Sequence, residues 1–299
     1  MTYDNFKKQI LSGLKERLPN ASLSIAPVLK NNAVTLDGLI ILENGTNISP
    51  TLYLNYYYEI YRSGTPLPDI LDSIRNTYQA ARPSGKINTS FFTNYQNVKY
   101  KIAYKLINYE ANKSLLADVP HYRKLDLAIV FYCLLSTSIT GNATILIRNE
   151  HLLFWNISKY QLFLQAKENT QRLLPYELEN MNHILKDLLK AHGEAINPDD
   201  WEELPECPMY VLTNKSKLYG ASCILYDHLL EDIAKKLNSD FYILPSSVHE
   251  VILFPTFDNT SYSELSQMVQ EVNETQVSPE ELLSDHVYYF SRSQNTILF

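Results

Sequence analysis

Apolar runs come in pairs along this chain, and only a few polar residues separate the two members of each pair. The clearest pairs lie in residues 34–54, 127–148 and 241–255, where the stretches ENGT, STSITG and PSS divide the two runs. Two strands joined by so short a connection pair antiparallel, because a parallel pair needs a crossover of about a dozen residues or more. The sequence therefore predicts antiparallel sheets built from hairpins.

Helical patterns lie between these pairs. An apolar residue at every fourth position of residues 6–18 predicts an amphipathic helix. Ser158 followed by Gln161, and Ser261 followed by Glu264, have the spacing of helix N-caps. Further helices are predicted over residues 68–81, 176–191 and 227–237, and a strand over residues 221–226.

The mixture of strands and helices lacks the regular alternation of parallel βαβ folds. It predicts the α+β class, with mixed, largely antiparallel sheets, helices packed on one face and two lobes. Residues 197–208 are rich in proline and acidic side chains and show no apolar periodicity. They are predicted to link an N-terminal lobe, residues 1–196, to a C-terminal lobe, residues 209–299.

Cysteine usage and apolar run length favour the cytoplasm. Cys133, Cys207 and Cys223 are far apart and form no CxxC pair, which fits a reducing compartment and indicates no metal site. The longest apolar run, residues 127–135, has about half the length of a membrane-spanning helix, so no membrane association is expected. No phosphate-binding or dinucleotide-binding glycine motif occurs, and no cofactor is expected.

The net charge of −7 argues against nucleic acid as the main partner. The charge is unevenly distributed: residues 1–150 carry a balance of +5 and residues 151–299 a balance of −12. This polarity is compatible with a basic face that meets a polyanionic partner or with an attraction between the two halves of the chain, and an interpretation without a specific ligand is favoured. The expected partner is an unknown protein or a small molecule.

Ser247 and His249 are the candidate catalytic residues, in the stretch FYILPSSVHEVILFP. On an extended backbone the two side chains share a face, so a contact between hydroxyl and imidazole is conceivable, and Glu250 points to the other face. A hydrolase elbow has glycines around its serine, and none flanks Ser247. The alternative is a turn between paired strands, with the serine hydroxyls bonded to the backbone.

Lys99, Lys101 and Lys105 are the candidate binding residues. The stretch VKYKIAYKLIN alternates with period two, which predicts a half-exposed strand with these three lysines on one face. Such a row could contact phosphates of a nucleic acid. Lysine on an exposed strand also hinders edge-to-edge aggregation and then needs no ligand.

Several longer strings, among them LINYEANKSLLADVPH, ILIRNEHLLFWNIS and MYVLTNKSKLYGASCILY, carry a resemblance to a family. From about Tyr3 to its last strand, the chain resembles an uncharacterised bacterial family of the domain-of-unknown-function kind, common in anaerobic gut bacteria. The resemblance implies a cytoplasmic bacterial protein. It brings no activity, cofactor or functional residue with it.

The sequence as a whole favours a non-enzymatic binding or regulatory module over an enzyme. The reasons are the abundant tyrosine, 22 residues, the polarised charge and the lack of convergent acid–base residues. Two alternatives remain open. One is a hydrolase or transferase that uses Ser247 and His249, and the other is a nucleic-acid-binding protein that uses the lysine face.

Overall fold

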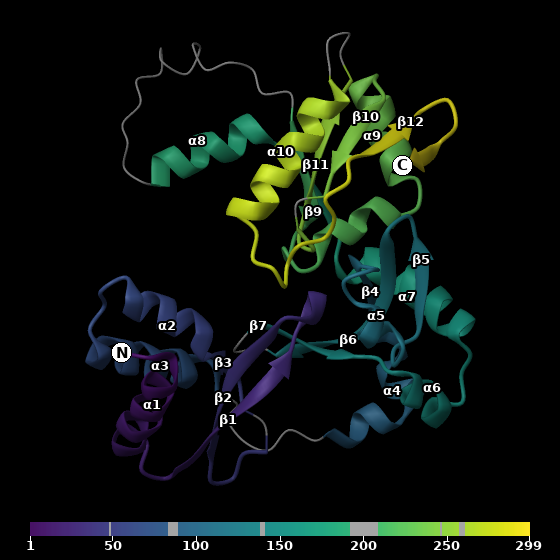
Figure 1. Cartoon of the computed structure of the whole chain (residues 1–299). Helices are drawn as coiled ribbons and strands as arrows, with labels where there is room; N and C mark the ends of the chain where they lie inside the picture. Colours follow the sequence, from purple (N-terminus) through teal and green to yellow (C-terminus); the bar gives the residue numbers. More distant parts are fainter. Residues whose placement is uncertain (48, 83–88, 138–140, 192–208, 246, 257–260) are drawn as a thin grey trace. The chain divides into compact units, whose positions relative to one another are not determined.

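The predicted hairpins form in the computed structural model, which describes every residue except 48, 83–88, 138–140, 192–208, 246 and 257–260 (Figure 1). The hairpin strands are β2 (Thr35–Glu43) with β3 (Thr51–Tyr53), β6 (Leu127–Thr137) with β7 (Gly141–Leu146), and β10 (Phe241–Leu244) with β11 (Val251–Pro255). Gly45 in the first connection has a φ of +88°, which glycine adopts without strain. The α+β class with antiparallel sheets is confirmed.

The described residues divide into two compact units. Unit 1 comprises Met1–Val98 and Leu134–Ile145, and unit 2 comprises Lys99–Cys133 and Leu146–Phe299. The predicted linker, residues 197–208, lies outside the described residues. The described part of the predicted C-terminal lobe belongs to the same unit as residues 146–191.

Unit 1 contains a three-stranded antiparallel sheet and the helices that pack on it. Its elements are α1 (Tyr3–Arg17), β1 (Ala21–Leu29), η1 (Asn31–Ala33), β2, β3, α2 (Leu54–Arg62), α3 (Leu67–Ala81), η2 (Thr89–Thr93) and α4 (Tyr95–Val98), and the sheet order is β1-β2-β3. The predicted four-residue spacing places Phe6, Ile10 and Leu14 of α1 fully inside one core with Leu39 and Ile41 of β2. The helical stripe thus buries itself against the sheet, as an amphipathic helix requires.

One sheet is arranged around β6, whose residues 127–133 belong to unit 2, whereas its residues 134–137 and residues 141–145 of β7 belong to unit 1. Its order is β4-β6-β5, with β7 also paired to β6; the neighbouring elements are η3 (Lys99–Lys101), β4 (Ile102–Asn108), α5 (Lys113–Leu116), β5 (His121–Lys124), α6 (Asn149–Trp155) and α7 (Lys159–Leu173). Helix α7 packs along β4 and bonds to its backbone. Thr170 Oγ1 accepts the amide of Tyr104 at 3.1 Å, and Asn169 Nδ2 donates to the carbonyls of Ile102 and Lys99 at 2.9 and 2.6 Å.

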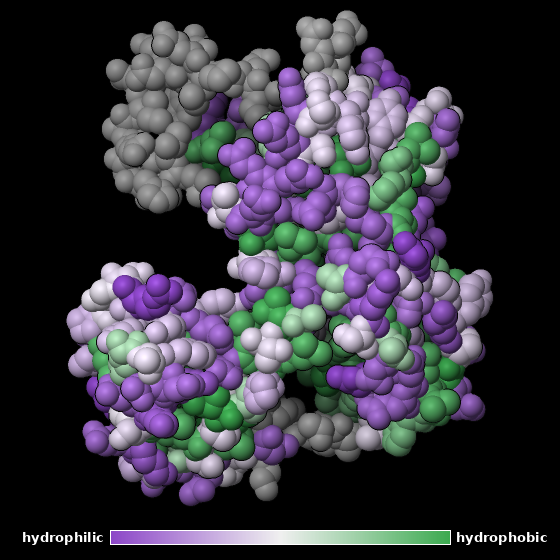
Figure 2. Space-filling view, viewed as in Figure 1, coloured by the Kyte–Doolittle hydropathy of each residue, from purple (hydrophilic) through white to green (hydrophobic). Residues whose placement is uncertain are grey.

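The other sheet of unit 2 has six strands, in the order β13-β12-β10-β11-β9-β8. Its further elements are β8 (Tyr176–Asn180), α8 (Met181–Ala191), β9 (Tyr210–Asn214), η5 (Gly220–Leu225), α9 (Leu229–Leu237), α10 (Tyr262–Thr275), β12 (Tyr288–Ser291) and β13 (Thr296–Leu298). Helix α10 buries Leu265 and Val269 against Leu244 of β10. Its outer surface is mostly hydrophilic (Figure 2), which completes an amphipathic pattern.

The predicted helix caps are confirmed. Ser158 caps α7 and exchanges bonds with Gln161 in a full capping box, and the hydroxyl of Ser261 accepts the amide of Glu264 at the start of α10. These are local interactions between residues three apart, so the sequence alone specifies them.

Three predicted elements are wrong. Residues 176–180 form the strand β8 instead of the first turns of a helix, because they pair with β9 from Tyr176↔Asn214 to Asn180↔Tyr210. Residues 220–225 form the 3-10 helix η5 instead of a strand. The predicted lysine strand begins only at Ile102, and residues 99–101 are helical.

Candidate functional site

The connection between β10 and β11 holds both candidate catalytic residues. Ser247 is 5% exposed, and its hydroxyl donates to Oε1 of Glu250 at 3.1 Å and accepts the amide of His249 at 3.0 Å. These bonds close a tight turn, the alternative that the sequence left open for this stretch. A bridge between Ser247 and Leu282 anchors the turn from outside.

Glu250 does not point away from His249, as an extended strand would require. Residues 247–250 precede the first residue of β11 and lie in the turn, where the period-two rule does not apply. The prediction that the two side chains face opposite sides of a sheet is therefore wrong, and both line one surface depression.

The imidazole of His249 bonds to a neighbouring loop and not to the serine hydroxyl. Its Nδ1 lies 3.1 Å from the carbonyl oxygen of Lys217 and 3.3 Å from the amide nitrogen of Tyr219. In one tautomer Nδ1 donates to that carbonyl, and in the other it accepts from that amide. Nε2 lies 3.7 Å from Oε1 of Glu281.

Asn214 shapes the loop that receives His249. Its fully buried side chain accepts the amides of Ser216 and Leu218 and donates to the carbonyl of Leu218 at 2.8 Å. Within this loop Lys217 and Tyr219 have φ values of +49° and +53°. Left-handed backbone at a residue other than glycine costs energy and is frequent at functional sites.

The ring of Tyr219 connects two of the residues that the sequence singled out. It stacks on the imidazole of His249, with centroids 5.6 Å apart and planes at 15°. The ammonium of Lys105 lies 4.1 Å from the centroid of the same ring, and Tyr132 meets the ring edge-on. The geometry with Lys105 is that of a cation–π contact.

Two neighbouring depressions meet at the His249 turn, and Lys217 and Glu250 line both. We call them together the Glu250 groove. The first has a volume of about 400 Å³ and is lined by Lys217, Ser247, His249, Glu250, Gln276, Val277 and Glu281. The second has a volume of about 300 Å³ and is lined by Glu179, Met181, Ile184, Val211, Thr213, Lys217, Glu250 and Ile252. Each volume lies near the lower end of the range for small-molecule sites.

Carboxylates line both depressions of the Glu250 groove, and apolar side chains gather in the second depression, its apolar end. Three carboxylates, on Glu179, Glu250 and Glu281, face one ammonium, on Lys217. Gln276 caps the C-terminus of α10, whose unpaired carbonyls add partial negative charge. The arrangement can therefore hold a positively charged group.

The surroundings of Ser247 lack the parts of an acyl-transfer site. Among the described residues the Ser247 hydroxyl bonds to Glu250 and to a backbone amide, not to an imidazole. The amides of Val248 and His249 are also committed, to Glu281 O and to Ser247 Oγ. An oxyanion hole needs such amides to be free to donate to the developing charge.

The candidate lysines do not form a row. Lys99 and Lys101 lie in η3, and only Lys105 lies on a strand, in β4. The ammonium of Lys99 rests over the ring of Tyr100, at 4.7 Å from its centroid. The prediction of a single lysine-bearing strand face is wrong, because residues 99–101 curl into a helical turn before the strand begins.

Within the described ranges, no three His, Cys, Asp or Glu side chains are grouped so that they could hold a metal ion. Across the same residues, no helix has both the length and the apolar character that crossing a bilayer requires.

These features define an α+β protein with an open, acidic groove beside a six-stranded antiparallel sheet. The chain belongs to the family DUF5688, a family of unknown function whose model matches residues 3–292. The match includes the whole of the Glu250 groove. No curated protein and no solved structure matches the chain.

Sequence reasoning found Ser247 and His249 but missed most of the groove around them. Glu179, Lys217 and Glu281 come from three separate segments, β8, the loop after β9 and the turn after α10. None of the three stands in a motif. The pairing of β9 with β8 and β11 brings Glu179 and Lys217 to the turn, and backbone contacts of Glu281 and Leu282 with Val248 and Ser247 add Glu281. No local signal could have identified them.

Proposed function

We propose that this chain is a non-enzymatic binding protein whose ligand is a small organic cation with an apolar part, held in the Glu250 groove. The observation that carries the proposal is the charge of the groove, where three carboxylates and a helix C-terminus surround one lysine. A cation placed there is stabilised by Coulomb attraction at short range.

The apolar end of the groove supports the apolar part of the proposed ligand. Met181 and Ile184 of α8 line it together with Val211 and Ile252, which are directly paired on β9 and β11. Burying a short alkyl chain against these side chains contributes about 0.8 kcal/mol per methylene. A linear amine therefore matches both ends, with its ammonium near Glu250 and its chain toward α8.

The proposed location is the cytoplasm. Cys133 and Cys223 are free thiols, both buried, and a reducing compartment keeps thiols in that state. Fractionation of native cells tests the location, and recovery of the protein from an oxidising compartment would contradict it.

The test of binding uses a matched pair of ligands, n-hexylamine and the neutral hexan-1-ol, titrated by isothermal calorimetry. The amine is expected to bind saturably and the alcohol is not. Glu250→Gln and Glu281→Gln should each weaken amine binding about tenfold, because a charge-assisted contact is worth about 1.5–3 kcal/mol. Glu168→Gln is the control, since Glu168 is an exposed carboxylate of α7 outside the groove and its loss changes net charge equally.

Equal binding of the amine and the alcohol, or identical effects of Glu168→Gln and Glu250→Gln, would overturn the proposal. The first outcome would mean that only the apolar end binds. The second would mean that net charge alone attracts the amine.

A serine-dependent hydrolase or transferase is the second candidate, because Ser247, His249 and Glu250 line one depression. Its chemistry would require the Ser247 hydroxyl to exchange its bond to Glu250 for one to an imidazole. A fluorophosphonate probe tests it directly. Labelling that disappears in Ser247→Ala would favour the enzyme, and labelling that persists would remove it.

A further inference from the structure

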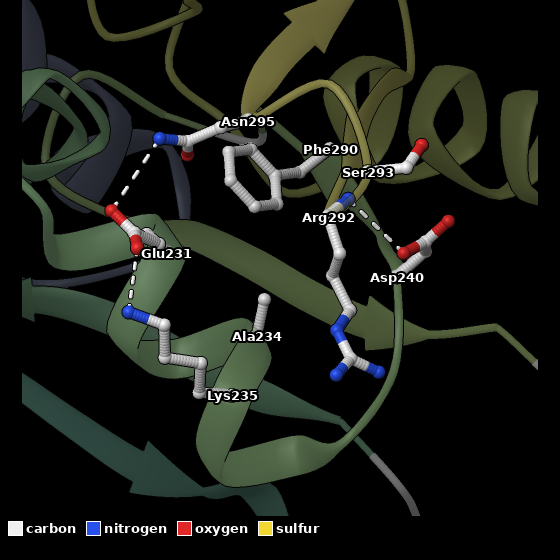
Figure 3. A pocket seen from close by; sticks show the side chains of 8 residues that line it. All are labelled: Glu231, Ala234, Lys235, Asp240, Phe290, Arg292, Ser293 and Asn295. Atoms are coloured by element: carbon white, nitrogen blue, oxygen red, sulfur yellow. Dashed lines mark hydrogen bonds and ion pairs between the residues drawn. The ribbon is translucent and has the colours of Figure 1, made fainter.

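A second cavity lies on unit 2 among α9, the segment before β10, and the turn between β12 and β13 (Figure 3). It shares no residue with the Glu250 groove and has a volume of about 420 Å³. The lining residues are Glu231, Ala234, Lys235, Asp240, Phe290, Arg292, Ser293 and Asn295.

Both carboxylates of this cavity are already bonded within the chain. Asp240 accepts the hydroxyl of Tyr289 on Oδ2 at 2.6 Å and the backbone amide of Arg292 on Oδ1 at 3.1 Å. Glu231 accepts Lys235 Nζ on Oε1 at 2.5 Å and Asn295 Nδ2 on Oε2 at 3.4 Å. The charge of Glu231 is thus balanced by Lys235, whereas Asp240 accepts two neutral donors.

The guanidinium of Arg292, in contrast to these carboxylates, is not bonded to the described residues. It makes no hydrogen bond or ion pair with any described residue, although Asp240 lines the same cavity. In Figure 3 its side chain lies across the cavity from Ala234 and Lys235, and no dashed line reaches the guanidinium. The five N–H donors and the positive charge of the guanidinium are thus available to a ligand in the cavity.

The backbone of Arg292 is held in place, whereas its guanidinium is free of bonds to the described residues. Its amide is fixed to Asp240, and the turn that carries it is closed by the amide of Gln294, which donates to Ser291 Oγ at 3.4 Å. The pKa of Tyr289 rises to about 12, chiefly because its hydroxyl donates to Asp240, so this support persists at neutral pH. A fixed backbone limits the entropy that Arg292 loses when it binds.

We propose that this cavity binds the oxyanion group of a small organic molecule, a carboxylate or a phosphomonoester, through the Arg292 guanidinium. The planar guanidinium matches two oxygens of either group in a bidentate pair. Ser293 and Asn295 provide polar groups beside it, and Ala234 and Phe290 provide the apolar part of the lining. The site is independent of the proposed amine groove.

The test titrates phenyl phosphate and benzoate, which share a ring and differ in the anionic group, into the full chain by isothermal calorimetry. At least one of the two is expected to bind saturably. Arg292→Gln should weaken that binding at least about tenfold, and Arg292→Lys should weaken it less, because lysine keeps the charge but not the fork. The control is Lys236→Gln, since Lys236 is an exposed cation of α9 that does not line the cavity.

Binding of only one probe, abolished in Arg292→Gln, would support the site and identify its preferred anion. Absence of saturable binding by both probes would overturn the proposal. So would equal losses in Arg292→Gln and Lys236→Gln, because these would reflect net charge and not the cavity. Arg292 is exposed, so its replacement is not expected to impair folding.

Discussion

The hydroxyl of Ser284 donates a 2.6 Å hydrogen bond to Oδ2 of Asp126, which lies 158 residues earlier in the chain. The same carboxylate accepts the hydroxyl of Tyr288 on Oδ1 at 2.6 Å, and Nδ1 of His286 lies 3.2 Å from Oδ2. Burial and the Asp126 charge raise the pKa of Tyr288, so its hydroxyl remains a donor at neutral pH. One carboxylate thus joins the turn between β5 and β6 to the segment that enters β12.

Removal of this bond is expected to destabilise the protein. Ser284→Ala should lower the free energy of unfolding by about 1.5–3 kcal/mol, because Ser284 is fully buried and its acceptor is charged. Urea denaturation measures the change. Ser216→Ala is the control, since Ser216 is exposed, and it should change the free energy by less than about 0.5 kcal/mol. Equal effects of the two substitutions would contradict this role of Asp126.

A contrast between two buried polar side chains tests how β4 is held. Asn169→Ala removes the donor to the carbonyls of Ile102 and Lys99 and should cost about 1–3 kcal/mol. Tyr132→Phe should cost nothing or stabilise slightly, because its buried hydroxyl has no partner among the described residues. The urea midpoint should therefore fall for Asn169→Ala and stay nearly unchanged for Tyr132→Phe. A larger fall for Tyr132→Phe would contradict the role given to Asn169.

The two buried thiols should be unreactive in the folded protein. Burial raises the pKa of Cys133 to about 11 and that of Cys223 to about 12, so at pH 8 neither forms the thiolate that reacts. In a Cys207→Ser chain, Ellman's reagent should detect two thiols only after denaturant is added. Fast reaction without denaturant would show that one thiol is accessible.

The raised pKa values of the two thiols also predict how the stability of the protein changes with pH. An unfolded thiol loses its proton near pH 9, whereas the folded ones keep theirs until about pH 11 or 12. The folded state therefore binds more protons between these values, and stability falls as pH rises above about 9. Replacing both cysteines with alanine should flatten this fall, measured as the slope of unfolding free energy between pH 8 and 10. An unchanged slope would assign the effect to other groups.

Gly220 is expected to tolerate no side chain. A Cβ built there would lie 2.4 Å from the carbonyl oxygen of His249 and 2.8 Å from the amide nitrogen of Asn214, both backbone atoms. Gly220→Ala should destabilise by at least about 2 kcal/mol and weaken ligand binding in the Glu250 groove, because the His249 turn must shift. Gly13→Ala is the comparison, since a Cβ there meets only the flexible side chain of Leu71, and its cost should be smaller.

Elements with local signals could be predicted from the sequence. The cap at Ser158 depends on Gln161 three residues away, and the hairpin of β10 and β11 depends on two apolar runs separated by a short polar stretch. Strand β8 was missed because the apolar–polar alternation in YELEN spans only four residues, and its pairing with β9 makes it a strand. The helical turn at residues 99–101 was hidden by an alternation that runs into β4, where the predicted half-exposed pattern is also wrong because Ala103 and Ile107 are buried.

The candidate site was predictable only at its centre. Ser247 and His249 stand in a recognisable turn, but the partners that decide their chemistry do not lie nearby in sequence. His249 bonds to a loop 32 residues earlier, and Glu281 reaches it from beyond α10. Arg292 could not be distinguished from other exposed arginines, because its significance comes from two carboxylates that bond elsewhere.

The bonds from α7 to β4 have a consequence for self-association. In the order β4-β6-β5, β4 would leave one row of backbone groups open to a strand from another molecule. Asn169 and Thr170 occupy two of those groups, the Ile102 carbonyl and the Tyr104 amide, so a strand can add there only after α7 detaches. Helix α7 therefore covers part of this edge, and we expect loss of its contacts to favour self-association through β4.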